Sequence, residues 1–157
     1  MIVLLLGLLA GLVITPVLFF RGLVLGVSRK RRSPAVLWKA AALLAGAGAI
    51  GMYVWGMAHV LSDVMYAEDG GADSSPILPC RAAGMDKAIH VVDYGIGFVP
   101  LRFECRLKDG GSYATSSVPA YVTPAAAVLG LAGIGFRVRS AVVADRSSPS
   151  RRAEHAR

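Results

Sequence analysis

Long apolar runs alternate with polar segments along this chain, and three runs are long enough to cross a lipid bilayer. They occupy residues 2–20, 40–61 and 120–136, and none contains an aspartate, glutamate, lysine or arginine. A membrane-spanning helix needs about 20 apolar residues, with a range of roughly 17–25. None of the runs has the polar face that a helix of a soluble protein presents to water. The pattern therefore predicts three transmembrane helices.

Two features of these runs affect that prediction. The third run is the shortest and contains Pro124, which falls in the first turn of the predicted helix, where proline is tolerated. The first run is followed by positive charges, whereas a cleaved signal peptide has its basic residues before the apolar core. We therefore interpret residues 2–20 as a retained membrane anchor.

The charged residues are divided unevenly among the polar segments. Six of the 17 basic residues lie in residues 21–39 and six in 137–157, whereas eight of the 10 acidic residues lie in 62–119. Short loops rich in lysine and arginine stay in the cytoplasm, and three alternating helices place 21–39 and 137–157 on one side. We predict a multi-pass protein of the cell membrane with its N-terminus outside.

This topology assigns a place to each polar segment. Residues 21–39 become a basic cytoplasmic loop, residues 62–119 an extracytoplasmic domain, and residues 137–157 a basic cytoplasmic tail. The tail is rich in Ser, Arg and Ala without an apolar period, so we predict that it is disordered.

One basic cluster within the loop consists of Arg29, Lys30, Arg31 and Arg32. Such a run can bind nucleic acid, but beside two membrane spans it is better interpreted as an orientation signal that contacts anionic lipid headgroups. We expect the lipid bilayer as a partner, together with a membrane protein or a second copy of the chain, and no nucleic acid.

The segment between the second and third runs has the pattern of a small antiparallel sheet. The acidic stretch 63–75 reads as a linker, and Pro76 and Pro79 predict an extended approach to Cys80. A first strand is expected over 88–94, bent or ended by Gly95 and Gly97.

The second predicted strand carries the clearest pattern. Residues 101–107 alternate between apolar and charged side chains, which places Cys105 on the apolar face. Asp109, Gly110 and Gly111 predict a hairpin turn, and residues 112–117 the returning strand.

Both cysteines of the chain, Cys80 and Cys105, fall in this predicted outer domain. Outer compartments are oxidising, and a domain this small has a marginal core. A disulfide between them would stabilise it by roughly 3–4 kcal/mol on the chain-entropy model. Two alternatives remain open, namely a reactive thiol pair and a metal site formed with His90 and Asp93, but no ligand spacing supports the metal site.

The sequence contains little sign of catalytic chemistry, and we expect no catalytic residues, cofactor or metal. A serine, His90 and Asp93 could form a triad, but no nucleophile-elbow pattern accompanies them. His59 is the ionisable residue within the apolar runs, and its position near Trp55 favours an interfacial role over a proton relay or haem ligand.

Two further groups of residues are candidates for contacts. A possible interaction surface comprises the polar face of the second strand with the acidic linker: Arg102, Glu104, Arg106, Lys108, Glu68 and Asp69. Small residues spaced four apart, which let helices approach closely in lipid, occur once in each apolar run: Gly7 and Gly11, Ala47 and Gly51, Ala126 and Gly130.

The stretch "PLRFECRLKDGGSY", followed by "VPAYVTP" and an apolar run, resembles small integral membrane proteins of streptomycete-type actinobacteria. These share a PLR-x-x-C strand, a DGG turn and a proline-bounded entry to the last span. The resemblance covers about residues 79–124 and implies no catalytic residues.

These features lead to a membrane α-helical fold with three spans and a disulfide-stapled antiparallel β domain between the second and third. We expect a non-enzymatic accessory or interaction protein of the cell envelope. The alternatives are an envelope thiol-redox protein or other enzyme using Cys80 and Cys105, and a small subunit of a transport complex.

Overall fold

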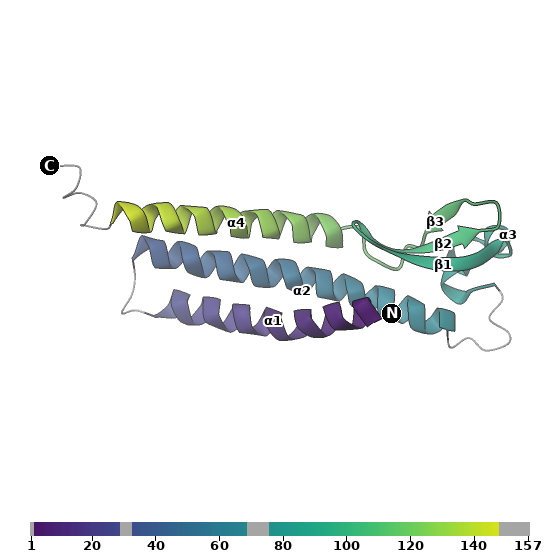
Figure 1. The fold of residues 1–157 in the computed structure, drawn as a ribbon, viewed down its shortest axis with the longest axis horizontal. Helices are drawn as coiled ribbons and strands as arrows, with labels where there is room; N and C mark the ends of the chain where they lie inside the picture. Colours follow the sequence, from purple (N-terminus) through teal and green to yellow (C-terminus); the bar gives the residue numbers. More distant parts are fainter. Residues whose placement is uncertain (1, 29–32, 69–75, 148–157) are drawn as a thin grey trace. The chain divides into compact units, whose positions relative to one another are not determined.

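The structure of the protein is a computed structural model that describes residues 2–28, 33–68 and 76–147. It divides into two compact units, Met1–Ala10 with Met52–Ala125 and Gly11–Gly51 with Ala126–Arg157. The helices and strands are α1 (Ile2–Val27), α2 (Pro34–Glu68), the 3-10 helix η3 (Leu78–Ala83), α3 (Met85–Ala88), β1 (Val91–Phe98), β2 (Leu101–Leu107), β3 (Ser112–Ala114) and α4 (Val122–Arg146). Figure 1 labels all of them except η3.

Three of the helices, α1, α2 and α4, are long and apolar enough to cross a membrane. The most apolar stretch of each helix is almost entirely exposed, because only 11%, 17% and 11% of its residues, respectively, are buried within the protein. These helices correspond to the three predicted apolar runs, and the prediction of three long apolar helices is confirmed.

All three helices extend beyond the runs that predicted them. Residues 21–27 and 34–39 are helical where we expected a loop, residues 63–68 where we expected the linker, and residues 137–146 where we expected a disordered tail. Hydropathy identifies only the part of a helix that suits the hydrocarbon of a membrane. The helices continue past it because the arginine, leucine and alanine residues at their ends are good helix formers. The rest of the predicted tail, from residue 148, lies outside the described residues.

The segment between α2 and α4 forms a three-stranded antiparallel sheet in the order β1-β2-β3 (Figure 1). The second strand and the turn after it were predicted correctly. Gly110 has φ of 87°, a conformation that glycine adopts without strain. The amide of Gly111 donates to Asp109 Oδ1 over 3.0 Å, which closes the turn.

The segments before the sheet differ from the prediction. Pro79 lies at the start of the 3-10 helix η3, so the approach to Cys80 is helical and not extended. Ala88 belongs to α3, and β1 begins at Val91. The strand continues through Gly95 and Gly97 to Phe98, so the prediction that these glycines could end it was wrong.

The core of the first unit includes residues of the sheet and of the helices. Phe103 is fully buried, and it belongs to one cluster with both cysteines, Leu101, and four helical residues: Leu4 of α1 and Met57, Val60 and Val64 of α2. The segment between α2 and α4 therefore does not form a core of its own but shares one with the first turns of α1 and the last turns of α2.

The second unit consists of helical segments of α1, α2 and α4 packed through small residues. A Cβ atom on Gly22 of α1 would lie 2.9 Å from Leu44 Cγ of α2. A Cβ atom on Gly133 of α4 would lie 3.4 Å from the carbonyl oxygen of Ala42. Ser140 Oγ donates to the carbonyl oxygen of Ala35 over 2.9 Å, a hydrogen bond between α4 and α2.

Candidate interaction surface

The outward face of the sheet is built from the charged residues of β2 and the glycines of β1. Arg102 lies opposite Gly97, Glu104 opposite Gly95, and Arg106 opposite Asp93. A Cβ atom on Gly95 would lie 3.1 Å from Arg106 Nη2, and one on Gly97 would lie 3.0 Å from Arg102 Cγ. Both arginine side chains therefore lie across β1, in space that a larger residue would occupy.

The charges on this face are paired with one another. Arg102 Nε donates to Glu104 Oε1, and Arg106 Nη1 lies 3.6 Å from Asp93 Oδ2. The side chains of Arg106 and Asp93 are 59% and 60% exposed, and exposed ion pairs of this kind contribute only about 0–1 kcal/mol. A partner could therefore replace the Arg106–Asp93 pair at small cost.

Two shallow hollows flank the hairpin. One, of about 350 Å³, is lined by Asp93, Glu104 and Arg106 together with residues of the turn. The other, of about 460 Å³, contains Lys108 with Asp86, Lys87, His90 and Asp109. The first hollow is therefore lined by three charged residues beside the turn.

Glu68, which we had grouped with these residues, meets the sheet from α2. Its Oε1 accepts a hydrogen bond of 2.6 Å from Tyr94 Oη, and the Tyr94 ring stacks on Phe103 with 5.2 Å between centroids. This hydrogen bond, followed by burial and the charges of Glu68 and Asp93, raises the pKa of Tyr94 to about 12. Glu68 thus links α2 to the sheet through Tyr94. Asp69 lies outside the described residues.

The predicted disulfide is present. Cys80 and Cys105 are bonded with 6.0 Å between their Cα atoms, and both are 0% exposed. Tyr113 Oη donates to the carbonyl oxygen of Cys80 over 2.8 Å, and burial raises the pKa of this tyrosine. Thiol exchange requires access to a sulfur atom, so this burial favours a structural bond over a redox-active one.

The other residues considered for chemistry do not come together. His90 is exposed, and Asp93 pairs with Arg106. Among the described residues, no group of three or more His, Cys, Asp and Glu side chains is arranged to hold a metal ion. His59 Nδ1 lies 2.9 Å from the carbonyl oxygen of Trp55, and their rings meet edge to face. The basic cluster 29–32 lies outside the described residues.

The small residues proposed for helix packing have mixed surroundings. A Cβ atom on Gly7 would lie 3.6 Å from Met57 Sδ, and one on Gly51 would lie 3.4 Å from Thr15 Cγ2. Gly11 and Ala47 are buried, whereas Ala126 and Gly130 are partly exposed, with open space beside Gly130.

The closest helix contacts involve glycines outside those pairs. A Cβ atom on Gly56 would lie 2.7 Å from both Leu101 and Val122, and one on Gly48 would lie 3.3 Å from Leu129. A spacing of four between small residues is a pattern along one helix. It does not identify a single glycine that contacts a large residue of another element, as Gly56 and Gly48 do.

The chain matches no protein-family model, no curated protein and no solved structure. The resemblance to small actinobacterial membrane proteins stays a prediction.

Proposed function

We propose that this chain is a multi-pass protein of the cell membrane that presents its disulfide-stapled sheet outside the cell and serves as a non-enzymatic accessory or interaction subunit. The observation that carries membrane insertion is the uncovered apolar surface of α1, α2 and α4. A soluble monomer rarely exposes contiguous apolar patches larger than a few hundred Å².

Helix length supports the same proposal. The 35 residues of α2 extend over about 52 Å at about 1.5 Å per residue, whereas the hydrocarbon core of a bilayer is about 30 Å thick. The excess fits a helix whose last turns, with Ser62, Asp63 and Glu68, leave the membrane. There Thr115 Oγ1 donates to the nearly buried Asp63 Oδ2 over 3.3 Å.

An interaction role is supported by the character of the sheet. Its disulfide is buried, its inner face is packed on helices, and its outer face carries weakly held ion pairs. A disulfide-closed element packed on helices suits a binding surface, because less backbone conformational entropy is lost when a partner docks.

Two measurements test insertion and topology. The chain should remain in the membrane fraction after alkaline carbonate washing, and a reporter inserted at Ser74 should be active only outside the cytoplasm. Release by carbonate would overturn membrane insertion. Retention with a reporter active only in the cytoplasm would overturn the orientation while leaving the insertion standing.

The binding role is tested by photo-crosslinking in native membranes. A crosslinking amino acid at Arg106, on the outer face, should give a defined adduct, and the same group at the exposed Met85 of α3 should not. Reversing the charge of Asp93 should weaken the adduct at residue 106. Equal adducts from both sites, or none from residue 106, would contradict an interaction surface on this face.

A further inference from the structure

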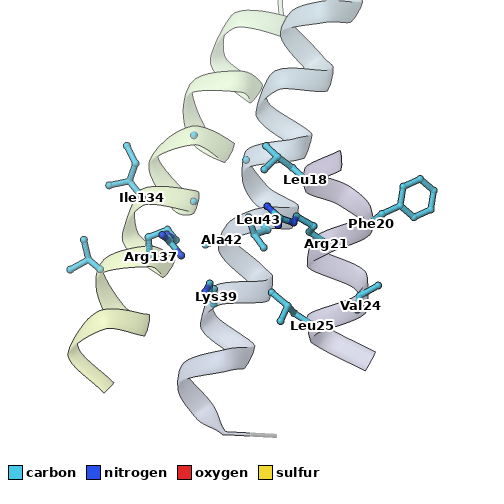
Figure 2. Close-up of a pocket in the computed structure, with 14 residues that line it drawn as sticks. Leu18, Phe20, Arg21, Val24, Leu25, Lys39, Ala42, Leu43, Ile134 and Arg137 are labelled. Atoms are coloured by element: carbon cyan, nitrogen blue, oxygen red, sulfur yellow. The ribbon is translucent and has the colours of Figure 1, made fainter. Parts of the chain in front are cut away.

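The second unit contains a cavity of about 970 Å³ among its helical segments of α1, α2 and α4 (Figure 2). Most of its lining is apolar, and the remainder is cationic. The lining residues are Leu18, Phe20, Arg21, Val24, Leu25, Lys39, Ala42, Leu43, Gly46, Gly130, Gly133, Ile134, Arg137 and Val138.

Three cations line this cavity, one from each helix. They are Arg21 of α1, Lys39 of α2 and Arg137 of α4, and Figure 2 shows the side chains of Arg21 and Arg137 directed toward the α2 segment between them. Among the described residues, none of the three forms an ion pair, and no aspartate or glutamate lines the cavity. The site therefore carries three positive charges without a carboxylate to balance them.

Small residues keep the apolar part of the cavity open. Gly46 and Gly130 both line it, and a Cβ atom on either would have no neighbour within 4 Å. Leu18, Leu43 and Ile134 supply apolar walls around this space. An apolar space of this kind suits a hydrocarbon chain better than a polar peptide, whose backbone groups would lose hydrogen bonds to water there.

The residues beside the cavity are those found where hydrocarbon meets headgroups. Trp38 precedes Lys39, and its ring lies 5.5 Å from that of Phe136, which precedes Arg137. Arg139 lies over the Trp38 ring at 4.8 Å from its centroid. Tryptophan and arginine are both favoured at this level of a bilayer, and Arg21 follows directly on the apolar run of α1.

We infer that this cavity binds one anionic phospholipid, whose phosphate contacts Arg21, Lys39 and Arg137 and whose acyl chain lies along the apolar walls. Charge complementarity selects the occupant, since three unbalanced cations beside an apolar space match an anionic headgroup attached to a chain. A headgroup with two phosphates should bind more tightly than one with a single phosphate. The inference rests on the proposed insertion into a membrane.

The two tryptophans of the chain allow a direct test with brominated lipids, which quench tryptophan fluorescence on contact. Trp55→Phe leaves Trp38 as the reporter next to the cavity, and Trp38→Phe leaves Trp55 as the reference. The full chain is reconstituted in phosphatidylcholine vesicles that contain a minor fraction of brominated cardiolipin, brominated phosphatidylglycerol or brominated phosphatidylcholine. Trp38 should be quenched at lower mole fractions of the anionic lipids, cardiolipin first, and Trp55 should not distinguish the three.

Substitutions then assign the effect to the cavity. Arg137→Gln should lower the apparent affinity for the anionic lipid about fivefold, and removal of all three charges should abolish the preference. Arg146→Gln removes one charge from the same helix outside the cavity and should leave the preference unchanged. Gly130→Leu should fill the apolar space and reduce quenching of Trp38, whereas Gly135→Leu, also at an open position of α4, should not.

The outcomes separate this inference from the proposed function. Equal quenching of Trp38 by anionic and zwitterionic lipids would overturn the lipid site while leaving insertion intact. The same holds if Arg146→Gln lowers the affinity as much as Arg137→Gln, because the attraction would then be to the general charge of the surface. Failure of every brominated lipid to quench either tryptophan would overturn insertion itself.

Discussion

In the first unit of this chain, large side chains fill the space between a sheet and the helices, whereas in the second unit glycines and alanines bring helices directly together. The buried residues around Phe103 and the disulfide belong to the first arrangement. The contacts of Gly22 and Gly133 belong to the second. Leu4, Met57 and Val60 of the first core lie within the apolar runs, so the difference follows the presence of the sheet and not a change from lipid to water. Where helices pack on helices in lipid, which is itself apolar, close packing holds them together.

The largest expected effect comes from removing the disulfide. In the Cys80→Ala/Cys105→Ala double variant the first unit should lose about 3–4 kcal/mol of stability, because the loop between these residues is no longer closed in the unfolded chain. Limited proteolysis should cut the variant between residues 76 and 119 while α1 and α4 stay protected by detergent. Loss of protection throughout the chain would show that the two units do not differ in this way.

The same bond also decides between a structural and a redox role. In the native fold it should resist mild reductant, since both sulfur atoms are buried. Thiol titration before and after unfolding measures this, and rapid reduction in the folded state would favour the envelope redox alternative.

A middle-sized effect is expected where a glycine contacts the core of the first unit. Gly56→Ala should destabilise that unit by about 1–3 kcal/mol, because the added methyl group would lie 2.7 Å from Leu101 and Val122. Gly135→Ala is the control in the second unit, where the methyl group meets nothing within 4 Å and should stabilise the helix by up to about 1 kcal/mol. Thermal unfolding in detergent compares the two, and effects of the same sign would contradict the structure at one of them.

The smallest effect concerns Tyr94, whose pKa is raised from its ordinary value of 10.0 to about 12 by its hydrogen bond to Glu68. A raised pKa means that the folded state favours the neutral phenol. The stability from this contact is therefore fully present below about pH 10 and is lost as the pH rises toward 12.

The Tyr94→Phe variant isolates this contribution. The free energy of unfolding should fall less between pH 9 and pH 12 in the variant than in the parent. Some loss should remain in the variant, because Tyr113 titrates in both proteins. An equal loss in both proteins would mean that Glu68 does not hold the phenol.

The strength of the sequence patterns decided which elements could be predicted. The apolar runs and the alternation around Cys105 follow from a single period each, and both identified their elements correctly. The helix ends were missed, since helix propensity continues where hydropathy stops. Residues 78–83 were also missed, because proline suits the first turn of a helix as well as an extended segment.

The contacts between elements were beyond the reach of local patterns. Glu68 was placed on the polar surface by its charge, but its partner Tyr94 is 26 residues away. The cavity with Arg21, Lys39 and Arg137 combines three segments that are far apart in the chain. Each of these cations was interpreted from the sequence only as an orientation signal.

Gly95 and Gly97 have a consequence for how this sequence can change over time. Because each of them lacks a side chain, an arginine of the neighbouring strand can lie over it. A side chain at either position would displace that arginine, and loss of the arginine would remove the need for glycine. Glycine at 95 with arginine at 106, and glycine at 97 with arginine at 102, should therefore be inherited and lost as pairs among related chains.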